Sequence, residues 1–154
     1  MGVSDRSAAA LTLSLETPDA AVIDLGELRG RAVLVIAFDY DDLRSQATLR
    51  EAELLARRHP DTLTVLALCG NPGPHQRLRA LLGAFSSVLG LTATRIVLAT
   101  DEIRAGTSSL GPIAHVPTTI LVNRAGFVAR TVVGLMDRGA LEALVQPALP
   151  PTAQ

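Results

Sequence analysis

One stretch constrains the fold of this chain more than any other: the continuous apolar run Ala32–Phe38, AVLVIAF. A strand that is apolar at every position has both faces covered, as in the central strand of an α/β protein. The acidic loop Asp39-Tyr40-Asp41-Asp42 follows it, and Asp41 or Asp42 is a suitable N-cap for a helix that Pro60 ends. Sites in α/β proteins lie beyond the carboxyl ends of such strands, so this loop is the first candidate site.

The other predicted elements alternate between strands and helices. Extended segments at 11–15 and 21–25 predict a β-hairpin, and further strands are expected at 62–69, 95–99, 118–123 and 127–133. Helices are expected from 41 or 42 to 59, at 75–89 and at 138–145. The helices between early strands imply parallel pairing and the late hairpin implies antiparallel pairing. The sequence therefore predicts one α/β domain over residues 11–146, with a mixed sheet covered by helices on both faces, a flexible lead at 1–10 and a disordered tail at 147–154.

Composition excludes several classes of function. The net charge is −1 and no face is visibly basic, which argues against binding to nucleic acid. No apolar run approaches the roughly 20 residues that span a bilayer. All 14 positive side chains are arginine, so the sequence offers no Schiff-base lysine. The single cysteine, Cys69, excludes an intrachain disulfide and a cysteine metal cluster. We predict no cofactor and no metal site.

The N-terminal segment gives no clear signal peptide. Its apolar part, Ala8–Leu15, is short, Asp5 precedes it, and Arg6 is the only positive side chain before it. The sequence leaves the compartment undetermined.

Three segments resemble the thioredoxin fold, and more closely its TlpA/ResA-like (redoxin) branch. The first is Asp24–Val35, DLGELRGRAVLV, which is similar to the family's lead-in to the strand that feeds the active site. The second is the helix after Asp42, and the third is Val116-Pro117-Thr118-Thr119 with the strand and glycine turn that follow. The resemblance implies a three-layer α/β/α domain with an N-terminal β-hairpin extension. Members of the family are thiol-disulfide oxidoreductases and are often extracytoplasmic.

The resemblance also implies where the site lies, and there the sequence departs from the family. Pro117 matches the family's cis-proline, which lies against the active-site loop. The family's Trp-Cys-x-x-Cys motif falls on residues 41–45, so Asp42 and Ser45 stand at the two cysteine positions; a shift of one residue would place Leu43 and Gln46 there instead. A helix N-terminus favours a carboxylate as it favours a thiolate. A carboxylate cannot form a mixed disulfide, which excludes exchange by the family mechanism.

Each candidate residue also has a structural interpretation. Asp42 is a helix cap or a catalytic base; Asp39 and Asp41 could join it around a cation, although their spacing matches no calcium loop. Tyr40 lies over the groove or packs against the core. Cys69 is a buried inert thiol or a reactive one at the carboxyl edge of the sheet. His115 precedes Val116-Pro117 and is expected to face the groove, but nothing in the spacing makes a triad of Ser45, His115 and Asp42.

Three functional hypotheses follow. The first is a redox-inactive protein that binds a protein or extended peptide at the cis-proline groove, through Tyr40, Asp41, Asp42, His115, Val116 and Pro117. The second is an oxidoreductase or peroxidase-related enzyme that uses Cys69. The third is a structural subunit, as a homodimer or in a larger assembly. The missing motif cysteines argue against an active dithiol enzyme.

Overall fold

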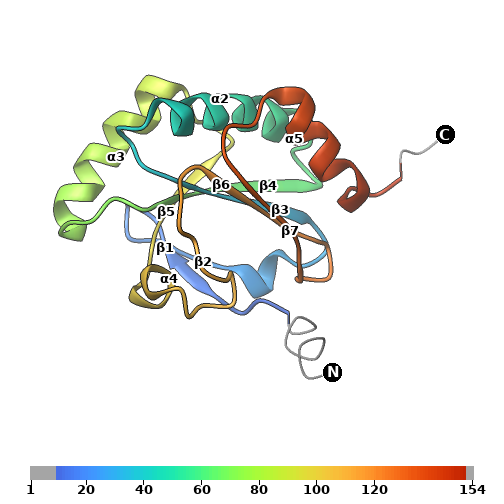
Figure 1. Ribbon diagram of the computed structural model, residues 1–154, viewed down its shortest axis with the longest axis horizontal. Coiled ribbons are helices and arrows are strands. Elements are labelled where there is room, and N and C mark those ends of the chain that lie inside the picture. The colour runs from blue at the N-terminus through green and yellow to red at the C-terminus, as the bar shows by residue number, and fades with distance from the viewer. Residues whose placement is uncertain (1–9, 152–154) are drawn as a thin grey trace.

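The apolar run Ala32–Phe38 forms β3, and all of its residues are buried. In the computed structural model, which describes residues 10–151, β3 is the middle strand of a five-stranded sheet with the order β5-β4-β3-β6-β7 (Figure 1). It pairs in parallel with β4 and antiparallel with β6, so the sheet is mixed as predicted. The strands are β3, β4 (Leu63–Cys69), β5 (Arg95–Leu98), β6 (Thr118–Val122) and β7 (Val128–Val133).

Helices cover both faces of this sheet, which confirms the three-layer α/β/α expectation. Figure 1 shows α2, α3 and α5 on one face, and α4 with a small two-stranded sheet on the other. The helices are α2 (Leu43–Arg58), α3 (His75–Leu89), α4 (Asp101–Ala105) and α5 (Arg138–Val145). The bounds of α3 and α5 are those expected from the sequence. Gly90, in the left-handed conformation with φ 71°, caps the end of α3.

Alternate residues of β3 supply two separate cores. Leu34, Ile36 and Phe38 pack against α2, α3 and α5, whereas Val35 and Ala37 face the layer that contains α4. This alternation follows from the two-residue period of a strand. The same alternation determines on which face of the sheet each side chain at the end of β3 lies.

The predicted N-terminal hairpin is present but shorter than expected. β1 (Ser14–Glu16) pairs antiparallel with β2 (Val22–Asp24) in a sheet of their own. β2 ends where a 3₁₀ helix, η1 (Leu25–Leu28), begins, because Asp24 caps that helix by accepting a hydrogen bond from the Gly26 N–H.

The structure differs from the expected disordered tail at residues 147–149. Gln146–Ala148 forms a second 3₁₀ helix, η2, and Ala148 and Leu149 are buried in the core beneath the helices. The apolar side chains of these residues pack onto the domain, so the folded part continues past residue 146. Residues 1–9, which make up most of the expected flexible lead, and 152–154 lie outside the described residues.

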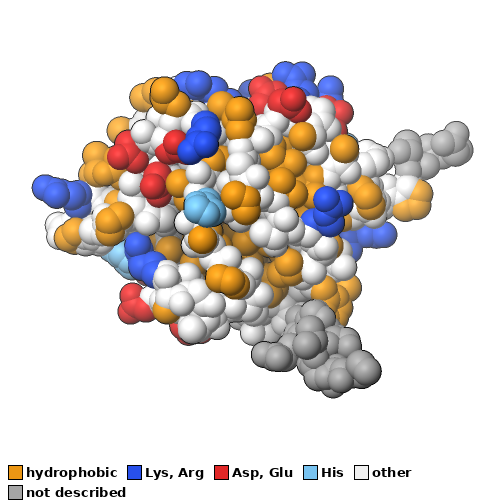
Figure 2. Space-filling model, in the orientation of Figure 1, with side chains coloured by type: hydrophobic (Ala, Val, Ile, Leu, Met, Phe, Trp, Pro, Cys, Tyr) orange, Lys and Arg blue, Asp and Glu red, His pale blue; other side chains and the backbone are white. Residues whose placement is uncertain are grey.

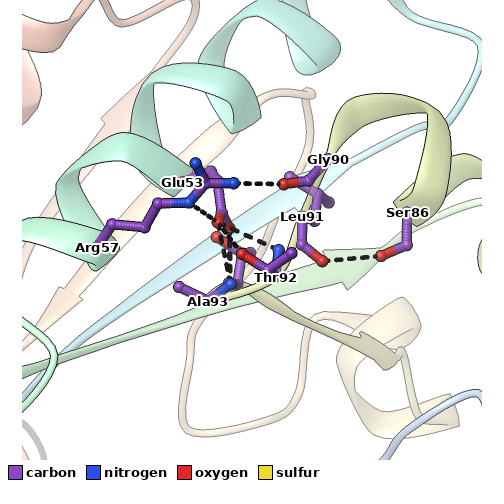
Figure 3. A network of polar contacts seen from close by, with 8 residues as sticks. Glu53, Arg57, Ser86, Gly90, Leu91, Thr92 and Ala93 are labelled. Atoms are coloured by element: carbon purple, nitrogen blue, oxygen red, sulfur yellow. Dashed lines mark hydrogen bonds and ion pairs between the residues drawn. The ribbon is translucent and has the colours of Figure 1, made fainter.

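A buried carboxylate joins α2 to the segment that precedes β5 (Figure 3). Glu53 is 3% exposed and accepts hydrogen bonds from the backbone N–H groups of Thr92, Ala93 and Thr94 at 2.8–3.1 Å. The Thr92 hydroxyl and Arg57 Nε donate as well, the latter at 2.7 Å. Burial raises the pKa of Glu53, but these donors outweigh it and hold the pKa at about 2. Glu53 is therefore a charged structural group.

Among residues 10–151, none of the helices combines the length and the apolar character needed to cross a bilayer.

Candidate functional site

The loop after β3 ends at Asp42, which caps α2. Asp42 has extended dihedral angles (φ −99°, ψ 120°), and its Oδ2 accepts hydrogen bonds from the backbone N–H of Ser45 at 2.9 Å and from the Ser45 hydroxyl at 2.8 Å. Ser45 is fully buried and its Oγ also accepts from the Asp39 N–H at 3.3 Å. The side chains at positions 42 and 45 therefore touch across the first turn of the helix.

The charge on Asp42 is stabilised by the same contacts. The hydrogen bond from the Ser45 side chain lowers the pKa of Asp42, and the backbone N–H of Ser45 and the nearby charge of Arg44, 3.9 Å away, add to this effect. A carboxylate with a lowered pKa is a weak proton acceptor. This geometry supports the capping role over that of a catalytic base.

The loop after β4 contacts the loop after β3 through Asn71, a residue that was not predicted as part of the site from the sequence. Asn71 is 7% exposed, and its Oδ1 accepts a hydrogen bond from the Tyr40 N–H at 2.8 Å. Its Nδ2 donates to Asp41 Oδ1 at 3.4 Å. The Gly-Asn-Pro-Gly sequence after a buried strand was the available signal, since asparagine in such a turn often bonds nearby backbone. The Tyr40 side chain packs against the core beneath the helices.

Cys69 lies close to the site in the chain but not in a reactive setting. It pairs with Phe38 at the carboxyl end of the sheet, is 1% exposed, and packs in the core beneath α2 and α3. Its thiol donates a hydrogen bond to Asn71 Oδ1 at 3.6 Å. Burial raises the pKa of the Cys69 thiol, and the charge of Asp39 raises it further. These conditions disfavour the thiolate that exchange chemistry requires.

The segment that leads into β6 forms the opposite wall of the site. The Val116–Pro117 peptide bond is cis. Pro117 accepts a backbone hydrogen bond from Gly134 at 2.8 Å, and Thr118 Oγ1 donates to the His115 carbonyl at 2.6 Å. Within residues 10–151, the N–H and C=O of Val116 make no hydrogen bond. Val116 lies two residues before the start of β6.

Exposed apolar side chains occur at the start of α2 and at the end of β7. Leu43 begins α2 and is 77% exposed, and Val133 and Leu135, 60% and 58% exposed, lie at and just beyond the end of β7. Val133 is the β7 partner of Thr118, which starts β6. Figure 2 shows apolar side chains across the middle of the visible face, with a histidine among them.

A pocket of about 400 Å³ adjoins Val116 on the α4 side of the sheet. It is bounded by the end of β3, the loop after β4, α4 and the segment before β6, and both Asp39 and His115 line it. Burial raises the pKa of Asp39, and the like charges of Asp41 and Asp42 raise it further. His115 is exposed at this pocket, away from the Asp42–Ser45 pair's hydrogen bonds. Residues 10–151 contain no group of three His, Cys, Asp or Glu side chains that could hold a metal ion.

No protein-family model matches this sequence, and no curated protein matches it either. Solved structures do match closely in shape. A thiol:disulfide interchange protein of the thioredoxin family from Chlorobium tepidum TLS is 19% identical, with 92% of this chain and 95% of that chain covered and a TM-score of 0.74. A thiol-disulfide isomerase from Corynebacterium glutamicum is 19% identical, with 94% and 98% covered and a TM-score of 0.71.

A secreted disulfide oxidoreductase from Mycobacterium tuberculosis, described as homologous to E. coli DsbE, is 14% identical, with 93% of this chain and 98% of that chain covered and a TM-score of 0.71. At such identities the likeness establishes the fold. The chain has the thioredoxin fold, and its shape is similar to that of thioredoxin-family and DsbE-like proteins. Their activities do not transfer with the fold.

Proposed function

We propose that this thioredoxin-fold protein binds an extended peptide segment of a partner protein at the Val116–Pro117 wall, and that it does so without thiol–disulfide exchange. The local motifs further assign it to the TlpA/ResA-like branch. The observation that carries the proposal is that, within residues 10–151, the backbone of Val116 makes no hydrogen bond. An extended chain placed beside it gains main-chain hydrogen bonds, which is the mode of recognition known as strand addition.

The surroundings of Val116 suit such a ligand. Leu43, Val133 and Leu135 present exposed apolar side chains on the flanking elements. Alternate side chains of an extended peptide point to opposite sides. A ligand at Val116 can therefore bury apolar groups against this rim while its backbone pairs with the wall.

The chemistry of the loop supports binding over exchange. The two side chains at the family's cysteine positions, Asp42 and Ser45, bond to each other and contain no sulfur. Cys69 is buried on the other face of the sheet from the pocket. With a raised pKa and no exposure, its thiol meets neither requirement of a nucleophile.

A peptide-binding measurement tests the proposal. The probe is a pool of fluorescein-labelled nonapeptides with alternating apolar and polar residues, and binding is followed by fluorescence anisotropy. We expect Val116→Asp to weaken binding at least tenfold, because it places a charge at the wall. Val88→Asp, at a position on α3 that is 79% exposed, introduces the same charge away from the wall and should bind as the wild type does. Equal binding by wild type and Val116→Asp would overturn the proposal, as would no binding by the wild type.

The reactivity of Cys69 gives an independent check. We expect maleimide to label the folded protein at least a hundredfold more slowly than the protein in urea, because Cys69 is 1% exposed. The labelled mass, measured by intact-protein mass spectrometry, provides the readout. Rapid labelling of the folded protein would favour the enzyme hypothesis.

A further inference from the structure

The pocket beside Val116 combines an apolar lining with one carboxylate. Leu68, Ala99, Ile103 and Ile113 contribute apolar side chains, and the pocket volume of about 400 Å³ lies at the small end of the range for ligand sites. A volume of this size suits one side chain or a small molecule rather than a whole peptide. The walls favour an aliphatic group.

Asp39 differs from the other two acidic residues of the loop in the surroundings of its carboxylate. The carboxylate of Asp42 is bonded to Ser45 and that of Asp41 to Asn71. Among the described residues, no hydrogen bond or ion pair involves the Asp39 carboxylate, which lines the pocket. Position 70 is a glycine, where a Cβ atom would lie 3.2 Å from Asp39 Oδ1. The missing side chain leaves room for this carboxylate.

The arginine that lines the pocket donates its hydrogen bonds to backbone carbonyls. Arg104 also lines the pocket, but its guanidinium donates to the carbonyls of Gly70 at 3.4 Å and Asn71 at 3.2 Å. No ion pair joins it to a carboxylate within residues 10–151. Burial raises the pKa of Asp39, and repulsion from the nearby Asp41 and Asp42 carboxylates raises it further. A cation that enters the pocket would relieve this repulsion.

We propose that the pocket receives a lysine or arginine side chain of the bound peptide, with the aliphatic stem against the apolar walls and the cationic group against the Asp39 carboxylate. Long basic side chains bury their stems on apolar surface while the charged end meets a polar partner. A charge-assisted hydrogen bond to a carboxylate is among the stronger polar contacts. This inference rests on the proposed function, since the peptide brings the side chain to the pocket from Val116.

The experiment compares matched peptides. Nonapeptides with blocked ends carry lysine, arginine, norleucine or glutamate at one scanned position, and anisotropy competition gives their affinities. At one position we expect lysine or arginine to bind at least tenfold better than norleucine, which has a similar stem without the charge. Asp39→Asn should remove this preference. Asp101→Asn, an exposed carboxylate on the neighbouring α4, should keep it.

The outcomes separate this inference from the proposed function. If the peptides bind, Val116→Asp weakens them, and norleucine equals lysine at every position, the pocket inference is overturned and the proposed function stands. A preference for glutamate, or one for lysine that survives Asp39→Asn, would also overturn it. n-Butylammonium and butyrate serve as free probes by NMR. Shifts at Ala99 and Ile103 with n-butylammonium alone, and no peptide binding, would assign the pocket to a free amine and overturn the peptide ligand.

Discussion

Glu53 and Asp39 are carboxylates near opposite ends of the same sheet, and their surroundings differ. Glu53, near the start of β5, accepts hydrogen bonds from three backbone N–H groups, a hydroxyl and an arginine. Among the described residues, Asp39, just beyond the end of β3, has no such partner, and it lines a pocket. Hydrogen bonds favour the charged form of Glu53, whereas burial and like charges disfavour that of Asp39. The first carboxylate serves stability, and the second is available to a ligand.

The largest expected effect is at Glu53. Glu53→Ala leaves the N–H groups of Thr92, Ala93 and Thr94 and the Arg57 guanidinium without their acceptor. Breaking a buried charged network costs about 3–5 kcal/mol in the free energy of unfolding. Urea denaturation measures it, with the exposed Glu27→Ala as control, expected within about 0.5 kcal/mol of wild type. Equal losses for the two variants would contradict the role assigned to Glu53.

The second effect is a pH dependence that comes from Glu53. Its pKa is about 2 in the folded protein against an ordinary value of 4.5, so its contribution is fully present above about pH 4.5 and is lost as pH falls toward 2. We expect the difference in unfolding free energy between wild type and Glu53→Gln to shrink over that window. By thermodynamic linkage, the shift of the Glu53 pKa from 4.5 to about 2 corresponds to about 3 kcal/mol of unfolding free energy, which is lost over this pH window. A difference that stays constant from pH 6 to 3 would contradict this prediction.

The smallest effect, at Asp39, should have the opposite sign. The pKa of Asp39 is raised in the folded protein, so ionisation above its ordinary value of 3.8 opposes folding. We therefore expect Asp39→Asn to raise the unfolding free energy at pH 7 by about 0.5 kcal/mol, a typical size for a site near the surface. The gain should fade below pH 3.8, where the unfolded protein is also protonated. A loss of stability at pH 7 would mean that Asp39 has a partner in the fold.

The sequence was sufficient to predict the elements around the candidate site. The apolar run of β3 predicted a strand covered on both faces, and its seven residues are buried. The resemblance at Val116-Pro117-Thr118-Thr119 predicted a cis-proline before a strand, and the Val116–Pro117 bond is cis and precedes β6. Asp42 was predicted as a cap from residue type and position, and it accepts the Ser45 N–H as a cap does. These features depend on residues that are close together in the chain, and such local patterns can be recognised in a sequence.

The different roles of Glu53 and Asp39 could not be predicted from the sequence. The donors to Glu53 are backbone groups at 92–94, about 40 positions along the chain, and any residue except proline supplies such a donor. The isolation of Asp39 depends on which neighbours bond elsewhere, Asp42 to Ser45 and Asp41 to Asn71. The packing of Ala148 and Leu149 likewise depends on the shape of the core rather than on the Pro-rich composition of the tail.

Catalysis of insulin reduction by dithiothreitol tests our proposal that this thioredoxin-fold protein does not perform thiol–disulfide exchange. We predict no catalysis by the wild type. Asp42→Cys/Ser45→Cys should form an internal disulfide and gain activity, because positions 42 and 45 face each other across the first turn of α2. Catalysis by the wild type that disappears in Cys69→Ala would contradict the claim, as would a double variant whose two new thiols cannot be oxidised to a disulfide.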